Sequence, residues 1–161
     1  MTLFCFFSLL RICAAAVLLL LISICDVRTG RLPSRPVRLL AASSLLRLIP
    51  LLPKFSGGSS SAFRAAFFEM LAGGAGTFLF LLGITWLSDR LFHADTLGGG
   101  DVKLAAALGL HLGLFPALLM LLAASLLALP EALLRQRRGA RGFPFAPCLS
   151  AAGLLFLILS S

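Results

Sequence analysis

Tyrosine is absent from this chain, tryptophan occurs once, and charged residues make up only 12% of the sequence. A soluble globular domain carries about 25% charged residues, so this shortage excludes an ordinary soluble protein. Apolar residues are in excess and account for 60% of the 161 positions. A membrane-spanning helix needs about 20 apolar residues, so this length supplies about six spans. We predict an all-α, polytopic membrane helix bundle of about six transmembrane helices, forming a single integral-membrane domain over residues 1–161.

Cysteine is scarce as well, and its spacing excludes two common uses. The chain has four cysteines and no Cys-x-x-Cys pair. Each lies in or at the edge of an apolar segment, where a thiol behaves as a small buried hydrophobic group. This spacing indicates neither a zinc site nor a disulfide framework. We therefore expect no metal and no cofactor. The four positions are Cys5, Cys13, Cys25 and Cys148.

Positive charge outweighs negative charge, with 14 Lys and Arg against 6 Asp and Glu. The basic residues form short clusters between apolar runs, at 28–38 and 135–141, rather than one continuous polar face. Clusters of this kind mark cytoplasmic loops under the positive-inside rule. We expect contact with membrane lipid and no binding of nucleic acid.

Six apolar segments follow one another along the chain, and their alternation defines a topology. The first is interrupted by Arg11 and lacks a basic leader, so we read it as a retained span; cleavage after residues 14–16 is the alternative. With the basic clusters inside, the chain begins outside, and both Asp26 and Asp101 fall at the cytoplasmic face. The expected segments are 3–25, 37–52, 63–87, 101–114, 116–134 and 145–160.

Asp26 and Asp101 are the candidate chemical pair. Two carboxyl groups in a partly desolvated cleft do not both ionise readily, so the pair shares one proton. One group then activates water while the other protonates a carbonyl oxygen. Gly98, Gly99 and Gly100 precede Asp101; they offer φ values closed to other residues and a close approach of substrate backbone. A helix start at Asp101 favours its ionised form. The alternative is an N-capping aspartate after a glycine loop.

Other polar residues near this pair have simpler explanations. Asp89, Asp95 and His93 fall in a loop and are expected to be solvated. His111 lies within a helical segment and is expected to pack there. Lys103 stands two positions after Asp101, so it points away from it on a helix. We expect Lys103 to anchor the helix at the interface, to tune Asp101, or to contact substrate.

Three motifs carry a resemblance to a known family. The first is the sequence from Leu97 to Leu104, with Gly98–Gly99–Gly100–Asp101 at its centre. The second is Asp26 followed by Arg28, Arg31, Leu32 and Pro33, and the third is Phe143-Pro144-Phe145-Ala146-Pro147. In their order along the chain, with the Asp26 motif first, they resemble the type IV prepilin peptidases, which are GxGD-type intramembrane aspartic proteases of bacteria. Ser34 and Ala146 depart from that pattern, where Asn and Gly are usual.

The resemblance implies a membrane-embedded aspartic endopeptidase of the bacterial inner membrane. Its substrate would be a single-span, pilin-like precursor protein, cleaved at the cytoplasmic membrane face to remove a short basic leader. Asp26 and Asp101 would be catalytic, with Gly98, Gly99, Gly100 and Lys103 near the substrate. The long members of the family also methylate the new N-terminus and carry a segment with paired cysteines. We see no such segment here and do not expect methylation.

Two functions of other classes remain open from the sequence. A small transporter or proton-relay subunit would use intramembrane acids as a relay. Acids deep inside the spans would favour that function, whereas here they gather at helix ends. A catalytically inactive assembly factor of a pilus or secretion machine is the other alternative.

Overall fold

The computed structural model describes residues 2–29, 33–49, 60–92, 98–137 and 145–160. These residues form six α-helices and one short 3-10 helix, and none of them lies in a strand. The prediction of an all-α bundle is therefore confirmed. The elements are α1 (Thr2–Thr29), α2 (Ser34–Ser43), η1 (Ser44–Arg47), α4 (Ser60–Phe92), α5 (Gly99–Leu112), α6 (Leu114–Arg137) and α7 (Ala146–Leu159).

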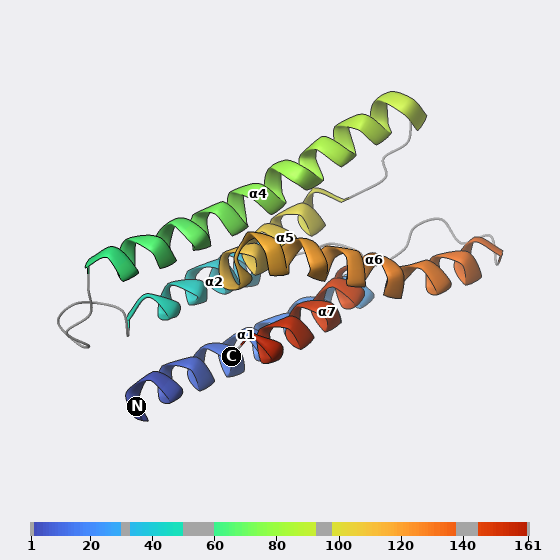
Figure 1. Ribbon diagram of the computed structural model, residues 1–161. Helices are drawn as coiled ribbons and strands as arrows, with labels where there is room; N and C mark the ends of the chain where they lie inside the picture. Colours follow the sequence, from blue (N-terminus) through green and yellow to red (C-terminus); the bar gives the residue numbers. More distant parts are fainter. Residues whose placement is uncertain (1, 30–32, 50–59, 93–97, 138–144, 161) are drawn as a thin grey trace.

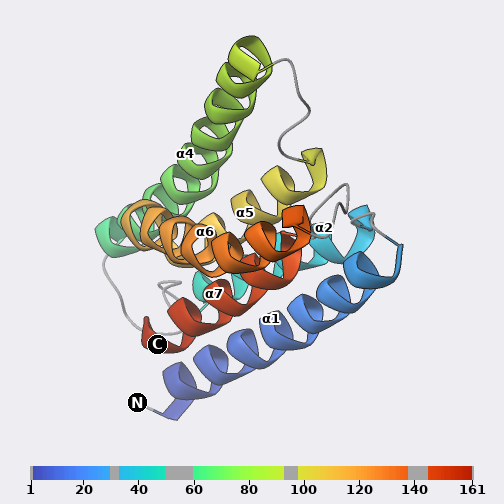
Figure 2. The same ribbon diagram turned by 90° about the vertical axis from the view of Figure 1, so that its right-hand side faces the viewer.

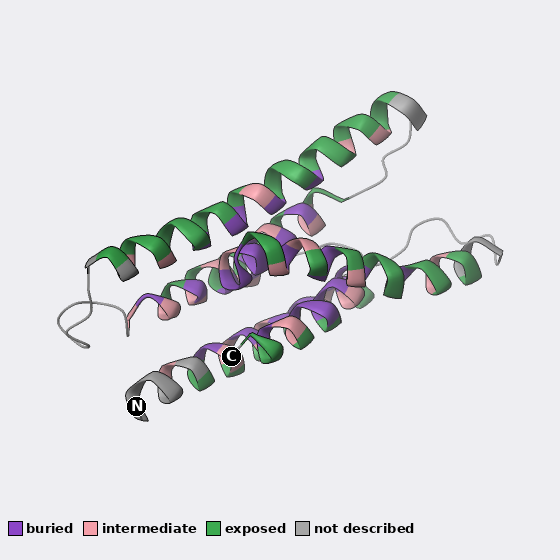
Figure 3. Ribbon diagram, viewed as in Figure 1, coloured by how far each residue is buried: buried purple, intermediate pink, exposed green. Residues whose placement is uncertain are grey.

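Three helices are long and apolar enough to cross a membrane. Their apolar stretches are Leu9–Arg28, Phe63–Arg90 and Leu114–Leu134, with 20, 28 and 21 residues. A bilayer core about 30 Å thick requires about 20 residues of helix, so each stretch is sufficient alone. Much of their length is exposed in the bundle (Figure 3), and many of the exposed residues are large and apolar. Such a surface is stable against lipid and costly in water.

The remaining helices are shorter. At 1.5 Å per residue, α5 and α7 are each about 21 Å long and α2 about 15 Å. The segment predicted at 37–52 is in fact α2 followed by the 3-10 turn η1, and residues 50–52 lie outside the described residues. The structure thus has helices at all six predicted places, but α2, α5 and α7 are not among those long enough to span alone.

The end of α1 differs from the sequence prediction. We expected the first helix to stop at Cys25 and Asp26 to begin a loop, whereas α1 continues to Thr29. No glycine or proline occurs between Asp26 and Thr29, so nothing in this stretch breaks the helix. Arg28 in the last turn also interacts favourably with the helix C-terminus. Asp26 is therefore held on a helix.

Helix α5 lies at the centre of the bundle, and its closest neighbour is α4 (Figures 1 and 2). Glycines allow this approach: a Cβ atom on Gly73 would contact the Gly109 carbonyl oxygen and lie 2.6 Å from Gly113 Cα. Thr77, one turn along α4, donates its hydroxyl to the Gly73 carbonyl within the same helix at 2.7 Å, and a Cβ atom on Gly109 would contact its Oγ1 atom. Small residues of this kind let membrane helices approach closely.

One end of the bundle collects several helix termini. Figures 1 and 2 both show that α1 finishes where α2, α5 and α7 begin. We call this the Asp26 end, because Asp26 lies in the last turn of α1. It also carries Arg28, Arg35, Arg38 and Lys103, which stand within the last turn of α1 or the first turns of α2 and α5.

At the opposite end, polar side chains tie the short elements to the long ones. Arg47 of η1 forms an ion pair with Glu69 of α4 at 3.1 Å and donates to the His111 carbonyl at 3.4 Å. The Nε2 atom of buried His111 lies 3.0 Å from the Leu40 carbonyl and 3.2 Å from the Ser43 hydroxyl. The prediction that His111 is a packing histidine is confirmed.

The glycine contact between α4 and α5 gives a direct test of the packing. Gly73→Ala should destabilise the protein by about 3 kcal/mol, the upper part of the range for overpacking, because backbone rather than a flexible side chain blocks the new methyl group. Gly83→Ala on the same helix is the matched control, since nothing lies within 4 Å of its Cβ position. Unfolding titrations in detergent would measure both variants. Equal stability of the two would refute the close contact.

Candidate active site

Asp26 is positioned by the start of α7. Its side chain is only 7% exposed, and it accepts a hydrogen bond from the backbone N–H of Ala146. Ala146 is the first residue of α7, where backbone N–H groups have no partner within the helix. The N-terminal end of a helix also favours a negative charge. The second carboxyl oxygen, Oδ2, is buried without a hydrogen-bond partner among the described residues, which is costly unless a further group binds there.

Asp101 occupies the first turn of α5, two residues after the helix begins. The N-cap is Gly98, with φ −68° and ψ 134°, and no side chain makes a capping hydrogen bond. The Asp101 backbone N–H donates to the Gly98 carbonyl at 2.9 Å. The alternative that Asp101 is an N-capping residue is therefore wrong. Its Oδ1 atom is buried and has no partner among the described residues, which is costly unless a further group binds there.

The two acids converge beside α7. Asp101 and Leu108 stand seven positions apart and so share one face of α5. Leu108 packs on Gly153 of α7, where a Cβ atom would lie 2.8 Å from the Leu108 Cδ1 atom. Asp26 is bonded to the first residue of the same helix. Both carboxyl groups therefore face α7 at the Asp26 end, from helices separated by most of the sequence.

The electrostatics of Asp101 agree with this convergence. Asp101 lies outside the three long apolar spans. Burial, and to a smaller extent the negative charge of Asp26, raises the pKa of Asp101 from 3.8 to about 6. We expected the helix N-terminus to favour ionised Asp101, but desolvation acts in the opposite direction and is larger here. Asp101 therefore retains a proton to a higher pH than an ordinary aspartic acid.

Such a pair can perform general acid–base chemistry. One carboxylate removes a proton from water while the neighbouring carboxylic acid donates a proton to a carbonyl oxygen. Each acid has one buried oxygen without a hydrogen-bond partner among the described residues, an unsatisfied acceptor that costs free energy until a further group binds it. Hydrolysis of an amide by this route uses no nucleophilic side chain.

The glycines beside Asp101 have a narrower role than the sequence suggested. Gly98 is extended and Gly99 and Gly100 are helical, so none of them needs a conformation closed to other residues. Gly98 and Gly99 are exposed, and nothing lies within 4 Å of a Cβ built on Gly99. Their lack of side chains leaves backbone accessible next to the Asp101 carboxyl group, as expected for a close approach of substrate.

The other residues that the sequence analysis considered are not placed beside Asp26 and Asp101. Lys103 is exposed and lines a groove between α2, α4 and α5 rather than the Asp101 side of the helix. Asp89 is exposed near the end of α4. His93 and Asp95 lie outside the described residues, as do Phe143 and Pro144 of the third motif.

The hydrogen bond from the backbone N–H of Ala146 to Asp26 was not predicted from the sequence. A signal for it exists, because Pro147 follows directly and the first turn of a helix is the preferred place for proline. A helix beginning at Ala146 leaves that N–H without a partner inside the helix.

Comparisons with known proteins point to one family. The family model described as "Type IV leader peptidase family" matches residues 13–133, a range that includes Asp26, Gly98, Gly99, Gly100 and Asp101. Two curated relatives, each named "Prepilin leader peptidase/N-methyltransferase", come from Burkholderia pseudomallei strains 1026b and K96243. Each is 34% identical over 155 residues, which cover 93% of this chain and 45% of the relative. The chain thus spans less than half the length of these relatives. No solved structure matches it.

The raised pKa of Asp101 can be checked by infrared spectroscopy. A protonated carboxyl band should disappear with a midpoint near pH 6, since the pKa of Asp101 is raised to about 6. Asp101→Asn should remove the band. Asp26→Asn should move the midpoint to lower pH, because a neighbouring negative charge is lost. A band that survives Asp101→Asn, or a midpoint unaffected by Asp26→Asn, would contradict the electrostatic pairing of the two acids.

Proposed function

The chain belongs to the type IV leader peptidase family, and on that premise we propose that it is a membrane-embedded aspartic endopeptidase. Its reaction is removal of the short basic leader from type IV pilin-like precursors. The observation that carries this proposal is the pair of carboxyl groups of Asp26 and Asp101, each with one buried oxygen unpartnered among the described residues. The names of the relatives support the substrate class.

In the proposed reaction, Asp26 is the base and Asp101 the acid of the first step. Asp26 accepts the Ala146 N–H, which orients its carboxyl group, while the raised pKa of Asp101 favours the protonated form of that residue. It removes a proton from water as the water oxygen attacks the scissile carbonyl carbon, and Asp101 donates its proton to the carbonyl oxygen. The resulting tetrahedral diol collapses when Asp26 gives its new proton to the amide nitrogen and Asp101 recovers its own. The products are a carboxyl group and an amine.

The precursor's cleavage segment would lie against the glycines. Gly98 and Gly99 are exposed beside Asp101, and Gly100 is half-buried, so an extended peptide can approach this backbone closely. Lys103, also expected near the substrate, projects on the other side of α5, where we assign it a different contact below.

The apolar helix of the precursor needs a surface of its own, and the groove between α4 and α6 suits it. These two helices diverge toward the Asp26 end in Figures 1 and 2. The groove has a volume of about 830 Å³, and Ser125 is the only hydrogen-bonding side chain among its fourteen lining residues. It reaches Phe145, which precedes Ala146, the hydrogen-bond donor to Asp26. An apolar helix seated here would bring its end to the acids.

We further propose a multi-pass arrangement in the bacterial inner membrane, with the Asp26 end in the cytoplasm. Basic residues at cytoplasmic helix ends set this orientation in other membrane proteins. Arg28, Arg35, Arg38, Arg90 and Lys103 lie near helix ends of this kind. The described helices act as a single peptidase domain in this proposal.

Substitution of either acid should abolish leader removal. Asp26→Asn and Asp101→Asn each delete one acid–base group, and we expect a loss of at least about 10³-fold, within the usual range for such groups. Cleavage of a co-expressed precursor would be measured by gel shift, with helical content checked by circular dichroism. Asp89→Asn, at the exposed end of α4, is the control and should keep activity.

Two results would defeat the proposal. Full cleavage by either active-site variant would show that the pair is not catalytic. A wild-type protein that binds the precursor without cleaving it would instead be an inactive assembly factor.

Site-specific photocrosslinking tests the groove between α4 and α6. A crosslinking amino acid in place of Leu122, which lines the groove, should capture the apolar helix of the precursor in an Asp101→Asn background that traps substrate. The same amino acid at Val17, an exposed position of α1, is the control and should capture little. Equal capture at both positions would show that the precursor uses another surface.

A further inference from the structure

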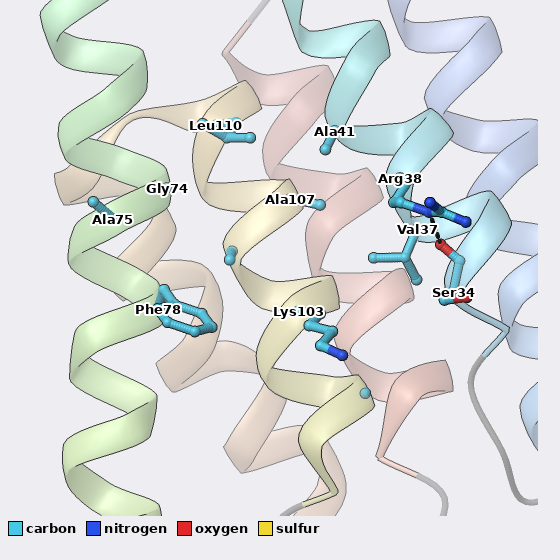
Figure 4. A pocket seen from close by; sticks show the side chains of 12 residues that line it. Ser34, Val37, Arg38, Ala41, Gly74, Ala75, Phe78, Lys103, Ala107 and Leu110 are labelled. Carbon is cyan, nitrogen blue, oxygen red and sulfur yellow. Dashed lines mark hydrogen bonds between the residues drawn. The ribbon is translucent and has the colours of Figure 1, made fainter.

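A second groove lies between α2, α4 and α5, away from the groove between α4 and α6. Figure 4 shows it between α2 and α4, with α5 as its floor. Its volume is about 630 Å³, within the roughly 300–1,000 Å³ of sites that bind small molecules. Glycine and alanine make up half of the twelve lining residues, which leaves the floor open. They are Ser34, Val37, Arg38, Ala41, Gly74, Ala75, Phe78, Gly100, Lys103, Ala106, Ala107 and Leu110.

The charges in this groove have one sign. Its charged residues are Arg38 and Lys103, and no acid is among the lining residues. Within the described part of the chain, neither cation has a carboxylate partner. Arg38 only donates its Nε–H to the Ser34 carbonyl at 3.4 Å, a bond that holds the side chain one turn back toward the start of α2. Asp101 lies on another face of α5, together with Leu108.

The cations belong to one end of the groove and the apolar residues to the other. Side chains on a helix lean toward its N-terminus, and both α2 and α5 begin at the Asp26 end. Arg38 and Lys103 therefore direct their charged groups toward the membrane surface on that side. Ala41, Ala106 and Leu110 lie further along α2 and α5 and continue the groove into the bilayer.

The length of the groove matches one leaflet. From Gly100 to Leu110, α5 rises about 15 Å at 1.5 Å per residue. The hydrocarbon core of a bilayer is about 30 Å thick, so one leaflet contributes about 15 Å. A molecule with an anionic head at Arg38 and Lys103 and an apolar tail of leaflet length would fill this space.

We propose that the groove between α2, α4 and α5 binds an anionic phospholipid of the leaflet at the Asp26 end. The phosphate lies between Arg38 and Lys103 and accepts from the Ser34 hydroxyl, and one acyl chain runs over Ala41 and Ala106 toward Leu110. Basic pockets between membrane helices hold lipid head groups in this way.

The positive charge of this groove favours an anionic phospholipid over the proposed precursor with its basic leader. A basic leader would be repelled by Arg38 and Lys103, whereas the groove between α4 and α6 has no charged lining residue. A free phosphate ion would satisfy the cations but leave the apolar floor uncovered. A phospholipid satisfies both parts of the groove.

Native mass spectrometry of the purified protein in nonionic detergent tests the proposal, with phosphatidylglycerol as the probe and phosphatidylcholine as the neutral-headed comparison. Wild type should retain one phosphatidylglycerol in preference to phosphatidylcholine. The double variant Arg38→Gln, Lys103→Gln should bind phosphatidylglycerol roughly thirtyfold more weakly. Each of the two cations removed usually contributes roughly fivefold near an anionic lipid surface. The matched control, Arg28→Gln with Arg90→Gln, removes the same net charge outside the groove and should bind as wild type does.

A third variant guards against loss of folding as the cause. Ala106→Phe keeps both cations but fills the floor, and it should also lose the bound lipid while its helical content stays unchanged. Equal binding of the two lipids, or equal retention by the groove variant and its charge-matched control, overturns the proposal. Displacement of phosphatidylglycerol by the apolar helix of a precursor would assign the groove to the precursor and overturn it as well.

Discussion

The close packing of α5 against α4 is the contact on which the rest of the arrangement depends. Gly73 on one helix meets Gly109 and Gly113 on the other at a separation that leaves no room for a Cβ atom. This contact draws a short helix into the centre of the bundle, where α2, α6 and α7 also pack on it. Because α5 is central, Asp101 in its first turn is half-buried, with its Oδ1 atom fully buried, and another face of the helix borders the groove between α2 and α4.

Burial and helix ends act on the two acids in different ways. Asp26 receives the free N–H at the start of α7, which compensates for part of its desolvation. Asp101 lies in the first turn of its own helix, but its buried Oδ1 atom has no hydrogen-bond partner among the described residues. Desolvation therefore dominates and raises the pKa of Asp101 to about 6. Two chemically identical side chains thus acquire different proton affinities from their surroundings, which is the condition for one to act as acid and the other as base.

Charge also distinguishes the two grooves. The groove between α4 and α6 has no charged lining residue and reaches Phe145, next to the residue that donates to Asp26, so it matches an apolar helix. The groove between α2, α4 and α5 carries two cations at one end and matches an anionic head group. Helix α4 contributes residues to both grooves, and electrostatic repulsion keeps a basic leader away from the groove that holds the proposed lipid.

The sequence by itself determined the all-α membrane class, the six helical segments and the glycine-mediated packing, because composition and small-residue spacing act locally. It also singled out Asp26 and Asp101 as a pair to consider. It misplaced Asp26 in a loop, assigned unusual φ values to Gly98–Gly100, and did not anticipate the Ala146 N–H or the two grooves. Only the tertiary structure decided these features, since a hydrogen bond between α1 and α7, or the desolvation of Asp101, depends on packing between segments far apart in the chain.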